Sequence, residues 1–218
     1  MKKYVTNIVL VLLIFLTGCA FEVDSISVPS GIIELETATI QDLFEPIQST
    51  IMMEGEPIYV ELYPFGKLIE EDEKNYANFV IFIQSELFYV QQSYNFLRIT
   101  PILGDLNAPL AFMEITQTAD IAVVEAIEKI KSEINFSALA SFAQFSHAPP
   151  TKDFPFDIIS FLEFDENMYQ DAKLIRIFIR DNLNGGVFII TTQHTLEATG
   201  GFGVRFVYFI STLKIINN

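Results

Sequence analysis

The chain has 218 residues, of which half are apolar and 19% are charged, so it can bury a substantial core and is unlike a disordered protein. Its 13 basic and 28 acidic residues give a formal net charge of −15. This charge disfavours nucleic acid as a partner, because such binding relies on Lys and Arg at the phosphates. The single cysteine excludes an intramolecular disulfide and a cysteine-based zinc site.

The first residues have the pattern of a cleaved secretion signal. Lys2 and Lys3 precede nine consecutive apolar residues, 8–16. A run of this length is typical of a signal-peptide core and is shorter than the roughly 20 residues that a membrane-spanning helix needs. We therefore expect residues 1–18 to be a signal peptide, with an uncleaved membrane anchor as the alternative.

The run ends in Leu16-Thr17-Gly18-Cys19, which resembles the lipobox of bacterial lipoproteins at all four positions. The resemblance implies that Gly18 is the cleavage-site residue and that Cys19 carries the lipid as the first residue of the mature chain. Several acyl chains on Cys19 would hold the protein stably at a membrane. Ala20 stands where lipoproteins of the inner membrane carry Asp. The resemblance thus implies the outer membrane in a Gram-negative cell, or the outer face of the membrane in a Gram-positive cell.

Residues 19–31 follow as the lipidated cysteine and a tether of mostly small and polar residues. We expect residues 32–218 to form a single domain, by the usual length of protein domains. At its start, residues 39–50 place apolar side chains at helical spacing, although Pro46 would distort a helix there. The alternation in residues 57–65 predicts a strand that ends in a Pro64-Phe65-Gly66 turn.

Residues 70–98 can be interpreted in two ways. Acidic residues 70–73 suit a helix N-terminus, and the apolar side chains that follow fall on one helical face. Residues 79–83, however, are an unbroken run of β-forming residues, which makes a strand pair the alternative. We favour the helix.

The clearest helix lies at residues 119–134, where Val123, Ile127, Ile130 and Ile134 share one face. Further Phe and Leu side chains extend this apolar face until Pro149-Pro150 interrupts the chain.

Three segments at the end of the chain predict a β-meander. The expected strands are 174–180, 187–197 and 202–216, with a turn at 181–186. Helices followed by a meander suggest an α+β domain, an antiparallel sheet ending in a C-terminal three-stranded meander with helices packed on one face. This outline is similar to cystatin-like and NTF2-like cones, an analogy that no motif supports.

His194 and Arg205 are the candidate ligand-binding residues. If Arg180 pairs with Val187 across the turn, His194 lies opposite Lys173 and shares the isoleucine face, near the mouth of a pocket between sheet and helices. A structural histidine is the competing interpretation. Arg205 belongs to residues 173–218, where five basic residues stand against two acidic ones.

No catalytic residue, metal site or cofactor is predicted. The sequence has no Gly-x-Ser-x-Gly, no HExxH and no glycine-rich phosphate loop. Residues 181–185 resemble an oxygen-rich calcium loop but lack its spaced acidic residues, so a hairpin turn explains them as well.

The sequence therefore predicts a membrane-anchored lipoprotein of the bacterial envelope that acts as a non-enzymatic binding or assembly module. Its expected partners are the membrane, through the lipid on Cys19, and an envelope protein or a lipid. Part of the surplus of 21 Phe residues would then line a lipid- or peptide-binding cavity. The alternative is an envelope hydrolase acting on glycan or lipid, which would use His194 with a nearby carboxylate.

Overall fold

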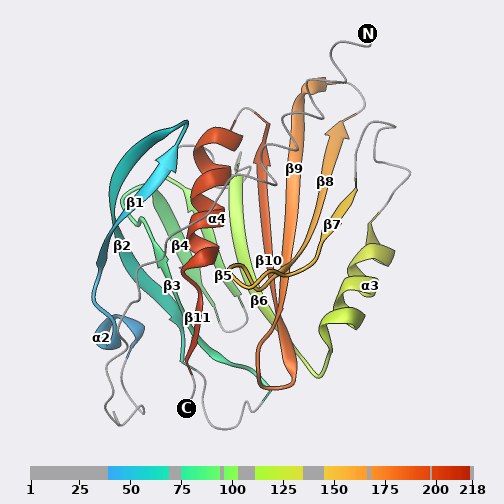
Figure 1. The fold of residues 1–218 in the computed structure, drawn as a ribbon, viewed down its shortest axis with the longest axis horizontal. Coiled ribbons are helices and arrows are strands. Elements are labelled where there is room, and N and C mark those ends of the chain that lie inside the picture. Colours follow the sequence, from blue (N-terminus) through green and yellow to red (C-terminus); the bar gives the residue numbers. More distant parts are fainter. Residues whose placement is uncertain are drawn as a thin grey trace. The chain divides into compact units, whose positions relative to one another are not determined.

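The computed structural model describes residues 39–68, 75–93, 96–102, 111–134, 145–165, 168–196 and 198–216, all of which belong to one compact unit. This part of the chain is mostly β-structure, with strands β1 to β11 and short helices between them (Figure 1). In chain order the elements are α2 (Ile40–Leu43), β1 (Ile47–Met53), β2 (Glu56–Lys67), β3 (Asn78–Ile83), β4 (Phe88–Gln92), β5 (Phe96–Pro101), β6 (Ala111–Ala119), α3 (Val123–Glu133), β7 (Ser146–Ala148), β8 (Asp157–Asp165), β9 (Met168–Asp181), β10 (Gly186–Thr195), the π-helical turn η1 (Thr199–Gly203), α4 (Val204–Ser211) and β11 (Lys214–Ile216).

The strands form two antiparallel sheets. The small sheet has four strands in the order β1-β2-β3-β11, and the large sheet has seven in the order β4-β5-β6-β10-β9-β8-β7. The predicted α+β fold, with helices on one face of a sheet and a C-terminal meander, is therefore wrong. The analogy with cone-shaped α+β domains falls with it, because helices lie on both faces of the large sheet.

The predicted helix at 70–98 is also wrong in the described residues, which form β3, β4 and β5 instead. All six residues of β3 are buried, so the strand is covered on both faces. A strand covered in this way shows no alternation of polar and apolar residues, which is why its pattern could be mistaken for a helix face. The acidic run at 70–73 lies outside the described residues.

The start of the domain follows the same trend toward β-structure. Only α2 remains of the helix expected at 39–50, and β1 begins directly after Pro46. The strand expected at 57–65 is confirmed as β2, but the turn at its end is wrong because β2 continues to Lys67. A side chain at Gly66 would collide with the Phe79 carbonyl of β3, which permits only glycine at this close approach.

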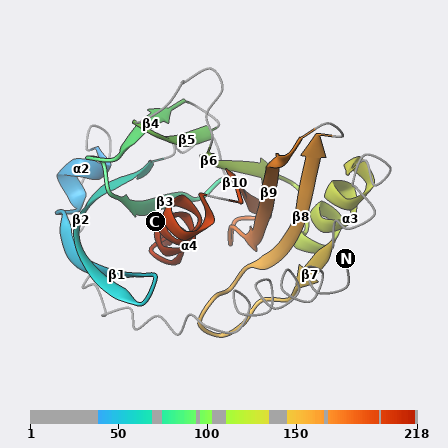
Figure 2. The same ribbon diagram turned by 90° about the horizontal axis from the view of Figure 1, so that it is seen from above.

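Helix α4 lies between the two sheets and fills the inner core (Figure 2). Phe206 and Phe209 of α4 contact Phe88 of β4 with ring centroids 5.7 and 5.4 Å apart. Phe79 of β3 meets Phe188 of β10 at 5.3 Å, which joins the sheets directly. Aromatic contacts thus connect α4 and both sheets in the inner core.

Helix α3 covers the opposite, outer face of the large sheet, which confirms the helix predicted at 119–134. Ala126 and Ile127 of α3 are buried against Ile159, Ile179 and Val187 of β8, β9 and β10. No helix in the described ranges is long and apolar enough to cross a membrane.

The C-terminal meander is wrong in its third strand. The β9–β10 hairpin forms as expected, but the segment predicted as a strand at 202–216 is mostly η1 and α4, followed by the three residues of β11. Phe202, Phe206, Ile210 and Leu213 stand at helical spacing in this segment. Its Val, Phe, Tyr and Ile content favours strands, but burial of a helical face between two sheets outweighs this weak preference.

Candidate functional site

The candidate site lies where β10 ends and the chain turns into α4. The connection contains η1, with the sequence Thr-Gly-Gly-Phe-Gly, and its π-helical bond runs from the Gly203 N–H to the Ala198 carbonyl at 3.4 Å. Single π-helical turns occur frequently at functional sites. This glycine turn, residues 199–203, brings together both residues that the sequence singled out.

His194 is buried against the glycine turn, with 1% of its surface exposed. Its Nδ1 lies 3.0 Å from the Thr195 carbonyl, and because a carbonyl only accepts, Nδ1 carries the proton and donates. Nε2 has no hydrogen-bond partner in the described chain. A Cβ added to Gly203 would lie 2.7 Å from Nε2, so the ring is packed directly onto the glycine backbone.

Burial lowers the pKa of His194, because the charged ring would lose its solvation. The hydrogen bond to the Thr195 carbonyl opposes this shift, and the charge of Arg176 adds to it. The ring is consequently held neutral and out of solvent. Together with the packing against Gly203, this leaves His194 without room to exchange a proton with a substrate.

The predicted pairing of His194 is wrong by one residue. Val187 pairs with Asp181, so His194 lies opposite Leu174 and not Lys173. His194 therefore shares the inner face with Phe178 and Phe188, while the isoleucines of β9 lie on the outer face under α3. The shift arises because Asp181 still belongs to the strand and the turn begins at Asn182.

Arg205 lies in the first turn of α4 and not in a strand. Its Nη1 donates to the Gly201 carbonyl at 3.3 Å, and its Nε donates to Gln84 Oε1 at 3.4 Å. Partial burial lowers its pKa. The guanidinium thus braces the glycine turn, and it does not line the groove described next.

A groove of about 380 Å³ separates the glycine turn from the tip of the β1–β2 hairpin. The Glu54 side chain lies over the turn, because a Cβ at Gly200 would approach Glu54 Oε1 to 2.9 Å. Neither Glu54 nor Glu56 forms a hydrogen bond or an ion pair with a described residue, so the groove presents free carboxylates next to apolar side chains. Its lining residues are Met53, Glu54, Glu56, Ile58, Gly200 and Gly201.

The cavity between the two sheets is far smaller. Its lining includes Phe79, Phe96 and Leu97, and its volume is about 20 Å³, which is the space for roughly one water molecule. A cavity of this size is too small for a lipid chain.

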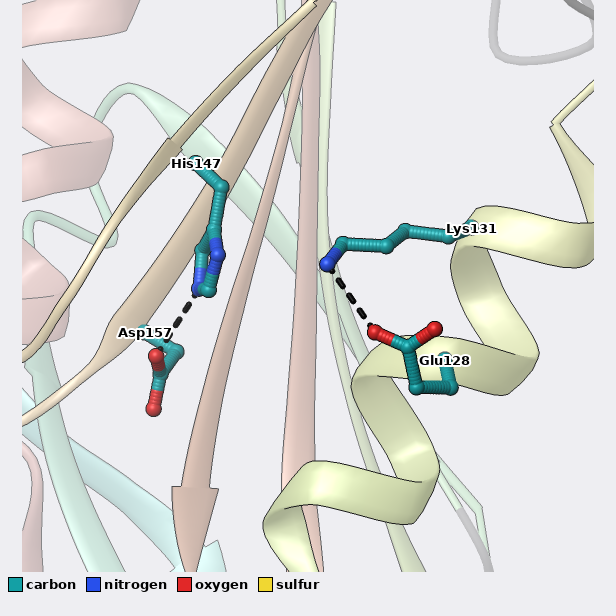
Figure 3. A network of polar contacts seen from close by, with 4 residues as sticks. All are labelled: Glu128, Lys131, His147 and Asp157. Atoms are coloured by element: carbon teal, nitrogen blue, oxygen red, sulfur yellow. Dashed lines mark hydrogen bonds and ion pairs between the residues drawn. The ribbon is translucent and has the colours of Figure 1, made fainter.

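A second polar cluster, which the sequence did not predict, lies on the outer face (Figure 3). His147 Nε2 of β7 is 2.9 Å from Asp157 Oδ1 of β8, and Lys131 of α3 pairs with Glu128 at 3.0 Å while its side chain reaches toward these strands. The His147–Asp157 contact has the geometry of a base and its orienting carboxylate. No described Ser, Thr or Cys hydrogen-bonds to His147, so the pair lacks a nucleophile there.

The loop at 181–185 is a hairpin turn, as the simpler interpretation predicted. The Asn182 side-chain oxygen accepts from the N–H groups of Asn184 and Gly186, both at 2.9 Å. Its Nδ2 donates to the Asn75 carbonyl at 2.9 Å. The oxygen that a calcium ion would need is thus already used within the turn.

Gly18 and Cys19 lie outside the described residues, so the lipobox remains a prediction. In the described ranges no three His, Cys, Asp or Glu side chains come together as a metal site would require. A comparison of the chain with models of known protein families and with curated proteins found no match.

Proposed function

We propose that this chain is a bacterial envelope lipoprotein, anchored through lipid on Cys19, whose folded domain is a non-enzymatic binding or assembly module. The observation that carries the proposal is the complete lipobox Leu16-Thr17-Gly18-Cys19 directly after a signal-peptide core. Ala20 supports the outer membrane as the location in a Gram-negative cell, and the outer face of the membrane in a Gram-positive cell. The lipid anchor would hold the domain beside envelope partners.

The environment of the two histidines supports a binding role over the hydrolase alternative. That alternative needs His194 beside a carboxylate in an open cleft, whereas His194 is buried against Gly203 and its neutral form is favoured. His147 does have a carboxylate partner, Asp157, which could orient the ring. No described nucleophile hydrogen-bonds to His147, so a catalytic arrangement is incomplete there. The open surface near the glycine turn, with free carboxylates and apolar side chains, is better suited to holding a partner.

Lipid labelling tests the anchor. The full chain, expressed with its leader in a bacterial host, should incorporate a clickable fatty acid, and Cys19→Ser should abolish the label and leave the leader uncut. Thr17→Ser is the matched control, because it keeps a small hydroxylated residue at its position and should be processed normally. Normal processing of Cys19→Ser would refute the lipoprotein proposal.

Crosslinking in intact cells tests the binding module. The anchored wild-type chain should give a reproducible adduct with a protein or a lipid that mass spectrometry identifies. An unanchored Cys19→Ser chain, exported with an ordinary cleavable signal peptide, should lose the adduct if anchoring provides the proximity. The absence of any adduct with the wild-type chain would contradict a binding or assembly role.

A further inference from the structure

The four outer edges of the two sheets differ in how well they are protected. A strand at the edge of a sheet presents unpaired N–H and C=O groups, which natural proteins protect by shortness, charge, proline or bulges. Strands β7 and β11 are only three residues long, and β4 has five. Strand β1 has seven residues, Ile-Gln-Ser-Thr-Ile-Met-Met, without a charge, a proline or a break in its register with β2.

The outer edge of β1 has no partner strand in the described part of the chain. The inner face of β1 is fixed to the core, because Ser49 shares a hydrogen bond with Tyr208 of α4 and Ile51 is fully buried. On the outward face, Met52 and Tyr59 are 54% and 82% exposed. A long, ordered edge beside exposed apolar side chains is the kind of surface to which an extended peptide adds as a further strand.

Carboxylates stand at both ends of this edge. Glu45 lies two residues before β1 and Glu54 directly after it, and neither forms a hydrogen bond or an ion pair with a described residue. If two copies paired antiparallel through β1, Glu45 of one copy would approach Glu54 of the other. This like-charge contact disfavours a second copy as the occupant. The same two negative charges would also repel a surface of anionic lipids.

We propose that the outer edge of β1 binds, as an added strand, an extended segment of a partner protein that carries basic residues at both ends of the paired stretch. One basic residue on each side of seven paired residues makes eight steps of roughly 3.3 Å, so the two basic positions would be about 26 Å apart. One end of the bound segment would lie beside the groove that contains Glu54 and Glu56. The inference rests on the proposed function as a binding module, although the lipid anchor plays no part in it.

Binding of short peptides to the full-length chain in detergent tests the proposal. The probe is a nine-residue fluorescent peptide with lysine at each end and alternating threonine and valine between, and anisotropy at low salt measures its affinity. We expect saturable binding that weakens with salt. A peptide with glutamate at each end should bind at least about tenfold more weakly, and an N-methylated lysine peptide, which cannot pair as a strand, should not bind.

Two pairs of matched variants locate the contact on the protein. The double variant Glu45→Gln with Glu54→Gln should bind the lysine peptide about threefold to tenfold more weakly, as expected for the loss of two exposed ion pairs. Glu125→Gln with Glu133→Gln, the same charge change on α3, should leave binding unchanged. Thr50→Lys places a charge on the β1 edge and should abolish binding, whereas Gln91→Lys on the β4 edge should reduce it only slightly.

Several outcomes would overturn the inference. One is equal affinity for the lysine and glutamate peptides. Another is an equal loss of affinity in the β1 pair of variants, Glu45→Gln with Glu54→Gln, and in the α3 pair, Glu125→Gln with Glu133→Gln. A third is loss with Gln91→Lys but not with Thr50→Lys, which would move the contact to β4. Dimerisation of the chain through β1, detected by sedimentation and removed by Thr50→Lys, would identify a second copy as the occupant. None of these results would change the outcome of lipid labelling at Cys19, so the inference and the anchor can fail separately.

Discussion

The two faces of the seven-stranded sheet are covered by different means. The inner face packs Phe188 against Phe79 of the small sheet and Phe178 against Phe156, and these rings are almost completely buried. The outer face packs the isoleucines of β8 and β9 against α3, and many of its neighbours are only partly buried. The side chains of the inner face are therefore more completely buried than those of the outer face, which is covered by one short helix.

The two histidines show what this difference does to a side chain of one type. His194 on the inner face is desolvated, lacks a partner at Nε2 and has a lowered pKa. His147 on the outer face keeps 31% of its side chain exposed and contacts a carboxylate. Position on the sheet, more than residue type, therefore decides which histidine can take part in chemistry.

Truncating one core side chain on each face is the strongest test of this difference. Phe209→Ala should destabilise the domain by about 3–5 kcal/mol, because it empties a fully buried site next to Phe88 in the aromatic cluster. Ile127→Ala on the outer face should cost about 2 kcal/mol, since its surroundings can relax toward solvent. Denaturant unfolding measures both values, and an equal cost would show that the two faces contribute alike.

A substitution at Gly203 tests the packing of the inner histidine. Gly203→Ala should destabilise the domain by about 1–3 kcal/mol, because its Cβ would lie 2.7 Å from His194 Nε2 in an already full core. Gly201→Ala is the matched control, because a Cβ at Gly201 meets no atom within 4 Å. Gly55→Ala would not serve, because Gly55 has a positive φ that strains any other residue. A His194→Ala background should remove most of the cost. If Gly203→Ala stays equally harmful there, the histidine contact is not its cause.

The sequence predicted helix α3 and the β9–β10 hairpin, and both form. Apolar residues recur at helical spacing in α3, and residues 175–180 alternate isoleucine with arginine or phenylalanine. The prediction failed in β3, where all six residues are buried and the alternation that distinguishes strand from helix is lost, and in α4, where β-forming residues such as Val207 and Tyr208 occupy the partly exposed face as well. Long-range packing decided those segments, and no local pattern records it.

The candidate site could be predicted only in part. His194 was expected on the isoleucine face, opposite Lys173, and this placement is wrong because Asp181 still belongs to the strand and shifts the register by one residue. The His147–Asp157 pair had no signal, because its residues lie ten positions apart on both sides of Pro149-Pro150 and meet only when β7 pairs with β8. Glu54 and the glycine turn meet only through the tertiary fold.

Acidification should reveal the burial of His194 through its effect on the stability of the domain. Because the pKa of His194 is lowered in the folded state, the unfolded chain takes up a proton first as the pH falls below about 6.5. The stability present above that pH should therefore decline as the pH drops further. His194→Gln should flatten this decline relative to wild type in denaturant unfolding series. An unchanged slope would mean that His194 titrates equally in both states, contrary to its burial.

The outer pair should contribute least. Asp157→Asn keeps an oxygen within hydrogen-bond reach of His147, and we expect a loss of about 0.5–1.5 kcal/mol, typical of a single hydrogen bond. Asp153→Asn, an exposed carboxylate in the preceding loop, is the matched control. A loss from Asp157→Asn as large as that of a core truncation would mean that the outer pair supports the sheet structurally, and that the contrast between the two faces is smaller than their burial indicates.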